Sequence, residues 1–447
     1  MASKVKSRWE ICDENEALLA DRKKTSEQKR LLKAQKLQKA NDVTAHLQSR
    51  PAKRRKLTPE PEAGLPEGQS TTKILRFPAP SWGPCRSVEE FEKLNDIAEG
   101  AYGWVSRVRE RATGKVVVLK RLKMEIANDG VPVTGLREIQ TMRGCNHPNI
   151  LEIREVVVGA DISKIENIFL VLDFFEHDLK TLLEDMIEPF LKSEIKTLLV
   201  QLASGVYYLH NNWIIHRDLK TSNLLLNNRG VLKIADFGMA RYFGAPPPKM
   251  TQLVVTLWYR SPELLLGAEH YGTAIDMWSV GCIFGELLTK DPLLQGKNEA
   301  DQLSKIFELC GTPTEQIWPG FKRLPNARHL RLLQNPISHG SVLRAKFPFL
   351  TTSGSSLLID LLSLDPVKRP SAEEMLNHDF FREDPKPKST EMFPTFPSKA
   401  GQEKRRRNTP NAPIRGRESG NRSDNFNKIF GKRDDEAKGA GFSLKLI

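Results

Sequence analysis

Two short polar motifs, separated by a strand-like apolar run, constrain this chain more than any other feature. The run HRDLKTSN places Asp218 and Asn223 close together in the sequence. The tripeptide DFG then puts Asp236 18 residues after Asp218, directly behind the apolar run VLKIA. An isolated DFG is usually an ordinary turn, because its glycine permits a sharp change of direction. Both motifs in this order indicate instead that two carboxylates and one amide converge on a single site.

These residue types fit phosphoryl transfer from ATP. That chemistry needs metal ligands, a cation on the phosphates, a cover over the nucleotide and a carboxylate that orients the attacking hydroxyl. In the pattern HRDLxxxN the aspartate accepts the hydroxyl proton and the asparagine binds a metal ion. We therefore predict Asp218 as the catalytic residue, and Asn223 and Asp236 as Mg²⁺ ligands.

A lysine and a glutamate supply the predicted contact to the phosphates. Lys120 ends the run VVVLK, which reads as a strand, and Glu138 lies in the following helical run GLREI. A lysine at the end of a strand is usually a solvated surface residue. Its place between a glycine loop and a helix favours the functional interpretation, in which Glu138 forms an ion pair with Lys120.

The glycine loop is AEGAYGWV, residues 98–105. Gly100 and Gly103 allow its backbone to close over phosphates. Ala98 stands where the pattern GxGxxG has its first glycine, and a strand conformation there would accommodate its methyl group. Ile97 and Val105 are predicted apolar contacts to adenine. The predicted nucleotide-binding residues of this region are Ile97, Ala98, Glu99, Gly100, Ala101, Tyr102, Gly103, Trp104 and Val105.

Thr251 is a predicted phosphorylation site. It lies between the DFG motif and the tripeptide SPE at 261–263. A phosphothreonine carries a charge of about −1.5 to −2 and needs arginines. Arg137, Arg217 and Arg241 are predicted to supply them. The alternative is an ordinary exposed threonine.

The pattern along the 447 residues predicts an α+β chain with two lobes and charged extensions. Short alternating runs predict a small β-rich lobe over about 87–175. Helical periods predict a larger lobe over about 176–381, in which Leu198, Leu199, Leu202, Val206 and Leu209 share one helix face. Residues 1–86 are predicted to be charged and largely disordered, with a transient helix over 13–50. Residues 382–447 are predicted to be a disordered basic tail.

The net charge of +13 is concentrated in these extensions. The runs PAKRRKL at 51–57 and KRRR at 404–407 resemble signals for nuclear import, so we expect a nuclear location. A solvated linker with incidental charge is the alternative. RNA binding by the tails is a further alternative. The basic runs lack interleaved aromatic residues for base stacking, which argues against it. The five cysteines form no CxxC pair, and no run of about 18 apolar residues occurs, so we expect a reducing compartment and no membrane span.

Together the motifs resemble the eukaryotic protein kinase family over roughly 91–381. The segments VTLWYRSPELLLG, HDLKTLL and GTPTEQIWPG are similar to those of cyclin-dependent kinases. The resemblance implies a bilobal protein kinase fold, ATP and Mg²⁺ as cofactors, a cyclin partner, and Ser or Thr followed by Pro as the phosphorylated site.

The resemblance also implies roles for further residues. Lys220 would contact the transferred phosphate, and Thr256 would support the catalytic loop. Leu172 would be the gatekeeper beside the adenine. The other implied residues are Asp173 and Phe175, whose backbones would bind adenine, Asp178 near the ribose, and the ion pair Glu263–Arg369 of the large lobe.

The helix PVTGLRE, residues 132–138, resembles the PITSLRE type of cyclin-dependent kinase, as do CRSVEEFEKLN at 85–95 and the last residues GFSLKLI. This implies an L-type cyclin and work in transcription and pre-mRNA splicing or in cell-cycle control. Ala101 departs from the family pattern, because many relatives carry an inhibitory threonine there beside the residue matching Tyr102.

Two other classes of function remain open on the sequence. A catalytically weak nuclear scaffold built on a kinase fold has Ala98 as its only support. A nucleic-acid-binding protein with an attached kinase domain would bind RNA through its tails.

Overall fold

The computed structural model describes residues 85–100, 103–122, 133–159, 167–251, 254–327 and 342–398. The chain divides into two units, Met1–Pro80 and Ser81–Ile447, and all described residues lie in the second. Most of the predicted N-terminal extension, residues 1–84, and the end of the basic tail, residues 399–447, lie outside the described residues.

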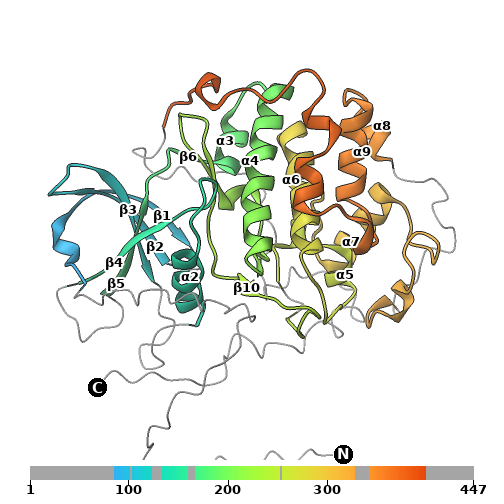
Figure 1. The fold of residues 1–447 in the computed structure, drawn as a ribbon, viewed down its shortest axis with the longest axis horizontal. Coiled ribbons are helices and arrows are strands. Elements are labelled where there is room, and N and C mark those ends of the chain that lie inside the picture. Colours follow the sequence, from blue (N-terminus) through green and yellow to red (C-terminus); the bar gives the residue numbers. More distant parts are fainter. Residues whose placement is uncertain are drawn as a thin grey trace, which may run out of the picture. The chain divides into compact units, whose positions relative to one another are not determined.

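The small lobe is a five-stranded antiparallel sheet with strand order β1-β2-β3-β5-β4 (Figure 1). Its elements are η1 (Val88–Glu90), β1 (Phe91–Gly100), β2 (Gly103–Glu110), β3 (Val116–Leu122), α2 (Val133–Gly144), β4 (Ile153–Val158) and β5 (Ile168–Asp173). Side chains of β3 alternate between the faces of the sheet, as a strand requires. Val117 and Leu119 are buried in a small core within this lobe, whereas Val118 joins the main core. Lys120 therefore shares the face of Val118.

The large lobe is helical and carries two short sheets. Its strands are β6 (His177–Asp178), β7 (Ile214–Ile215), β8 (Leu224–Leu226), β9 (Leu232–Ile234) and β10 (Arg241–Tyr242), paired as β6-β8-β9 and β10-β7. Its α-helices are α3 (Leu179–Asp185), α4 (Lys192–Asn211), α5 (Pro262–Leu265), α6 (Ala274–Thr289), α7 (Glu299–Cys310), α8 (Leu343–Lys346), α9 (Thr352–Leu361) and α10 (Ala372–Leu376). Its 3₁₀ turns are η3 (Thr221–Asn223), η4 (Leu257–Tyr259), η5 (Phe321–Arg323), η7 (Pro366–Lys368), η8 (Asp379–Phe381) and η9 (Thr390–Met392).

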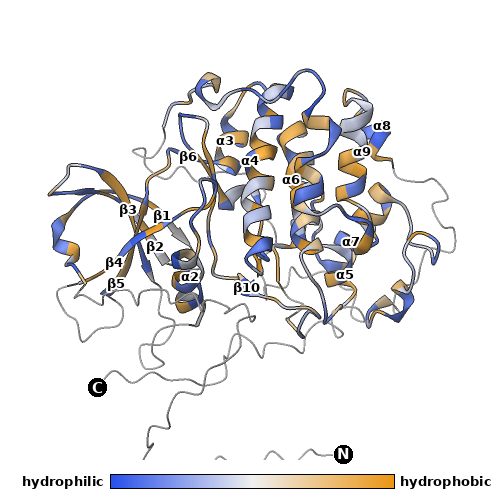
Figure 2. Cartoon of the chain, viewed as in Figure 1, coloured by the Kyte–Doolittle hydropathy of each residue, from blue (hydrophilic) through white to orange (hydrophobic). Residues whose placement is uncertain are grey.

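Helices α4 and α6 form the centre of the large lobe, and Figure 2 shows apolar residues concentrated along α6. The five residues predicted to share a face of the 192–211 helix are all buried in the main core, which confirms that periodicity. The α+β fold, with a β-sheet lobe and a helical lobe, is likewise confirmed. Within the described part of the chain, no helix has the length and hydrophobicity needed to cross a bilayer.

The predicted start of the disordered tail at residue 382 is wrong for residues 382–398. This segment packs on the large lobe, where Phe393 is 6% exposed and the backbone of Lys388 accepts a hydrogen bond from Thr197. Its basic and proline-rich composition suggested disorder. The aromatic residues Phe393 and Phe396 supply the apolar contacts that such segments usually lack.

Candidate active site

The lysine of β3 forms the predicted ion pair with the glutamate of α2. Lys120 Nζ lies 2.6 Å from Glu138 Oε1 and 3.8 Å from Asp236 Oδ1, and both members of the pair are buried. Burial opposes the charged form of Lys120, but the carboxylates of Glu138 and Asp236 outweigh it and raise the lysine pKa. Lys120 is thus a fixed cation.

Asp218 lies at the centre of a hydrogen-bond network in the catalytic loop. Its Oδ2 accepts from Lys220 Nζ at 2.7 Å and from Asn223 Nδ2 at 3.2 Å. Its Oδ1 accepts from the backbone N–H of Thr256 at 3.0 Å and from the Thr256 hydroxyl at 2.8 Å. The structure therefore brings three of the predicted site residues together around the carboxylate of a fourth.

The catalytic loop is anchored by a buried carboxylate that could not be identified from the sequence motifs. Asp276 of α6 accepts hydrogen bonds from the backbone N–H groups of His216 at 2.9 Å and Arg217 at 3.0 Å. Its Oδ2 also contacts His210 Nε2 at 3.0 Å. Burial would raise the pKa of Asp276, but hydrogen bonding and charge from His210 lower it. An acidic residue inside the apolar run AIDMWSVGCIFGELL was the available signal, since such residues are rarely buried without a partner.

Asp236 and Asn223 fit a divalent metal. Asp236 Oδ1 is buried and accepts no hydrogen bond from the described residues. Asn223 commits its Nδ2 to Asp218 O at 2.8 Å, which leaves its amide oxygen as the atom for a metal. No group of three or more His, Cys, Asp or Glu side chains among the described residues could hold an ion by itself. Two protein ligands suit Mg²⁺, which is usually completed by substrate phosphates and water.

The glycine loop is a β1–β2 hairpin in which Ala98 pairs with Val105 and Gly100 with Gly103. Ala98 is thus in a strand. Ala101 and Tyr102 lie outside the described residues, as do the side chains of Ala98, Glu99, Gly100 and Gly103.

The two sides of β2 have different surroundings. Val105 is opposite Lys120 in the register and shares its face, whereas Trp104 is opposite Arg121. The guanidinium of Arg121 stacks 5.3 Å from the Trp104 ring. The side chain of Trp104 therefore points away from the lysine, and of the predicted nucleotide contacts in this strand Val105 is the one that faces the site.

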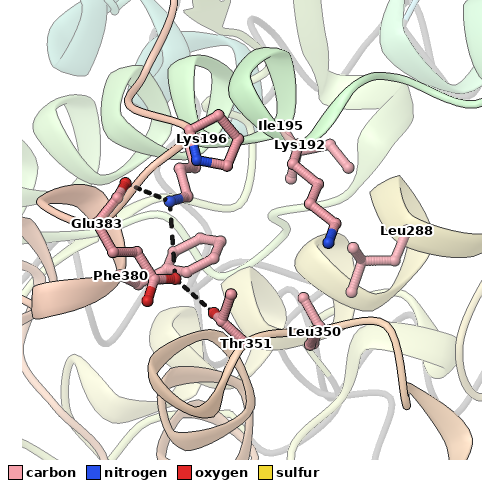
Figure 3. A pocket seen from close by; sticks show the side chains of 9 residues that line it. Lys192, Ile195, Lys196, Leu288, Leu350, Thr351, Phe380 and Glu383 are labelled. Atoms are coloured by element: carbon pink, nitrogen blue, oxygen red, sulfur yellow. Dashed lines mark hydrogen bonds and ion pairs between the residues drawn. The ribbon is translucent and has the colours of Figure 1, made fainter.

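The connection between the lobes follows β5. Leu172 is buried near the end of that strand, and Asp173 accepts a hydrogen bond from Arg154 at 2.6 Å. Phe175 is partly buried against the main core. Asp178 is the N-cap of α3, where its Oδ1 accepts from the backbone N–H of Thr181 at 2.8 Å. The pocket of Figure 3 involves none of these residues and lies elsewhere in the large lobe.

The predicted phosphosite is connected to the catalytic loop through a tyrosine. Arg217 donates to Met239 O at 2.7 Å and to the Tyr271 hydroxyl at 3.0 Å. That hydroxyl in turn donates to the backbone oxygen of Thr251. Arg241 lies in β10, paired with Ile215 next to the catalytic loop, and Arg137 lies in α2.

The ion pair between Arg369 and Glu263 is bidentate, with distances of 2.6 and 2.7 Å. It ties the segment after Thr256 to the large lobe. Both residues are buried, so the two hydrogen bonds are shielded from water.

Val255 is a second residue that the sequence did not reveal. Its φ of +66° places a β-branched side chain in the left-handed region, which costs on the order of 1–3 kcal/mol. Its carbonyl oxygen accepts from Arg260 Nη2 at 3.0 Å and Nε at 3.2 Å. The strained backbone thus turns this carbonyl toward Arg260.

Comparison with known families identifies the fold. The family described as "Protein kinase domain" matches residues 91–381, which is more than half of the chain. The chain belongs to the protein kinase family. Membership implies ATP and a divalent metal as cofactors of this kinase.

Several relatives are cyclin-dependent kinases. "Cyclin-dependent kinase 11B" of Homo sapiens is 48% identical over 380 residues, covering 82% of this chain and 46% of the relative. "Cyclin-dependent kinase G-1" of Oryza sativa subsp. indica is 54% identical over 329 residues, covering 72% and 46%. "Cyclin-dependent kinase 11" of Dictyostelium discoideum is 50% identical over 324 residues, covering 72% and 88%.

The chain thus spans about half the length of the human and rice relatives. The predicted place among PITSLRE-type cyclin-dependent kinases is confirmed by these similarities, which extend over most of the chain. The family match and these relatives together make the chain a Ser/Thr protein kinase.

Proposed function

We propose that this kinase transfers the γ-phosphate of Mg-ATP to Ser or Thr followed by Pro in protein substrates, and that it does so when bound to a cyclin. The observation that carries the proposal is the joint presence of the Lys120–Glu138 ion pair and the Asp218 network. A catalytically weak scaffold would need neither the ion pair nor the Asp218 network. Its only support is Ala98, whose backbone pairs with Val105 in the β1–β2 hairpin.

The residues have separable roles in this reaction. Asp218 would orient the substrate hydroxyl and accept its proton, because two hydrogen bonds from Thr256 hold its carboxylate in place. Lys220 would neutralise charge on the transferred phosphate, and Lys120 would bind the other phosphates. Asp236 and Asn223 would hold Mg²⁺, which supplies charge neutralisation when bound.

The backbone of Val255 supports selection of proline after the phosphorylated residue. In a bound substrate, the residue after the phosphorylated Ser or Thr would normally offer its backbone N–H to a neighbouring carbonyl oxygen. The Val255 carbonyl already accepts from Arg260, so an ordinary residue at that position would leave its N–H without an acceptor. Proline has no N–H, so it avoids that cost.

The cyclin would bind at α2, which carries Glu138. On this helix, Leu136 is 41% exposed, and Glu138, two residues later, forms the ion pair with Lys120. An L-type cyclin, a nuclear location and work in transcription and pre-mRNA splicing or cell-cycle control belong to the proposal through the resemblance of PVTGLRE. The basic runs at 51–57 and 404–407 lie outside the described residues and support the location by composition alone.

A peptide pair tests the specificity. The full chain, purified with an L-type cyclin, is assayed with Mg-ATP on a Ser-Pro peptide and on the same peptide with Ser-Ala. An unpaired buried amide costs about 1–3 kcal/mol, so transfer to Ser-Pro should be faster by a factor of about 5–150. Equal rates on the two peptides would contradict the role assigned to Val255, and no transfer to either would contradict the proposed function.

A further inference from the structure

Residues 383–398 form an extended segment that follows the large lobe back toward the connection between the lobes; we name it the C-terminal strap. Figure 1 shows it as the red segment that runs from the neighbourhood of α9, past α4, toward β6. It contains the short turn η9 and is held along its length by side chains of α4 and of the β8–β9 hairpin.

The strap begins at a buried lysine. Lys196 of α4 is 1% exposed, and its Nζ donates to Glu383 O at 2.9 Å and lies 4.6 Å from the centre of the Phe380 ring. The Thr351 hydroxyl donates to the Glu383 carboxylate (Figure 3). Burial lowers the pKa of Lys196, partly offset by Glu383. A buried cation paired in this way fixes the first residue of the strap.

The middle of the strap lies along α4. The Thr197 hydroxyl donates to Lys388 O at 2.7 Å, and Lys388 Nζ lies 3.2 Å from Glu194. Phe393 is buried, with its ring 5.8 Å from that of Phe190.

The β8–β9 turn leaves room for the strap only because residue 230 is a glycine. A Cβ on Gly230 would lie 2.6 Å from both Phe393 Cβ and Thr390 O. Contacts this short cannot be accommodated without moving the strap or the turn. The strap therefore occupies a closely fitted position.

The far end of the strap reaches the segment that precedes Asp178. Asn228 pairs with Phe396 twice, since Phe396 N donates to Asn228 Oδ1 at 2.9 Å and Asn228 Nδ2 donates to Phe396 O at 3.0 Å. The same Oδ1 lies 3.3 Å from His177 Nε2, and Asn228 N donates to Glu176 Oε2 at 3.3 Å. The Phe396 ring packs edge-on against His177 at 6.0 Å. Asn228 thus joins the strap to the two residues before Asp178.

From these contacts we propose that the C-terminal strap is a brace for nucleotide binding. Asn228 and Phe396 are positioning residues that hold Glu176 and His177, and through them Asp178, in the conformation that receives the ribose of the nucleotide. This inference rests on the proposed function, which makes that segment part of the ATP site.

The physical effect is on the population of a binding-competent conformation. Without the brace, the segment from Glu176 to Asp178 would occupy additional conformations. The apparent Kd for nucleotide would then equal the intrinsic Kd divided by the fraction of molecules in the binding-competent conformation. The Asp218 network and the Lys120–Glu138 pair lie outside the strap contacts. Release of the strap should therefore raise KM for ATP while leaving kcat at saturating ATP unchanged.

Two variants test the brace in the full-length chain. Asn228→Ala removes the paired contacts to Phe396, and Gly230→Ala forces the strap away from the β8–β9 turn. Each should raise the Kd of a nonhydrolysable ATP analogue with Mg²⁺ by about fivefold, the factor that corresponds to one net hydrogen bond. KM for ATP of the cyclin complex should rise by the same factor at constant kcat.

Matched controls separate the brace from a loss of stability. Gly114→Ala carries the same positive-φ strain as Gly230→Ala, at +69° against +73°, but its Cβ meets nothing within 4 Å. Asn377→Ala removes an asparagine hydrogen bond to Glu373 O, a carbonyl of α10 rather than of the strap. Both controls should keep the wild-type Kd.

The outcomes are distinct. A fivefold change confined to the two strap variants supports the brace. If wild-type binds the analogue and both strap variants bind it equally well, whether or not they unfold at lower temperature, the strap is a structural element only and the proposal is overturned. A wild-type chain that binds no analogue overturns the brace and the proposed function together.

Discussion

A buried carboxyl behind the catalytic loop should make the stability of this kinase fall as pH rises from about 4.5 to about 7. Glu286 of α6 is 1% exposed. It accepts hydrogen bonds from the Thr221 hydroxyl at 2.8 Å and from the Tyr259 hydroxyl at 2.6 Å. Burial raises the pKa of Glu286 to about 7, against the lowering effect of these two hydroxyls. The residue joins the catalytic loop to the segment before Arg260.

The sign follows from the proton balance. Between pH 4.5 and 7 the folded chain keeps a proton on Glu286 that the unfolded chain has lost, so the free energy of unfolding decreases as pH rises. A shift from 4.5 to about 7, at roughly 1.4 kcal/mol per unit, amounts to about 3 kcal/mol, lost in full above pH 7.

Glu286→Gln isolates this effect. Glutamine cannot ionise, and one of its two polar atoms cannot accept, so the variant should be less stable than wild-type at pH 5 by about 1–3 kcal/mol. The deficit should shrink or reverse by pH 8, changing by about 3 kcal/mol between the two pH values. Urea unfolding at several pH values measures the difference, with the exposed Glu391→Gln as control. Parallel stability curves for wild-type and Glu286→Gln would refute the reasoning.

Three further substitutions probe the site. Glu138→Gln leaves the buried Lys120 without its nearest carboxylate and should lower the free energy of unfolding by about 3 kcal/mol, measured by urea denaturation, and raise KM for ATP. Asp276→Asn replaces an acceptor with a donor facing the backbone N–H groups of His216 and Arg217; kcat should fall at least about tenfold, and a wild-type kcat would contradict the anchoring role. Arg369→Lys cannot keep both hydrogen bonds to Glu263 and should lower the melting temperature, whereas an unchanged value would show that the pair adds nothing.

The features that could be predicted from the sequence are those carried by local pattern. The alternation of VVVLK places Lys120 on the inner face of its strand, and the helical period of 192–211 defines the buried face of α4. The residues of HRDLKTSN are adjacent in the chain, so their convergence on Asp218 needs only one loop.

The features that escaped prediction depend on partners distant in the chain. Asp276 acts through backbone groups of the catalytic loop, about 60 residues earlier in the sequence. The left-handed backbone of Val255 has no residue signature, because valine is among the least suited residues for it. The basic composition of the strap predicts a disordered tail, because the packing of Phe393 and Phe396 depends on Phe190 and His177, which are distant in the sequence.

The central claim is that Asp218 and its network transfer phosphate from ATP. The most direct measurement compares phosphate incorporation into a Ser-Pro peptide by the full chain with its cyclin, as wild-type, as Asp218→Asn and as the exposed control Asp360→Asn. Loss of a positioned general base should lower kcat by about 10²–10⁴-fold in Asp218→Asn, with nucleotide binding retained and the control active. Undiminished activity of Asp218→Asn would contradict the account.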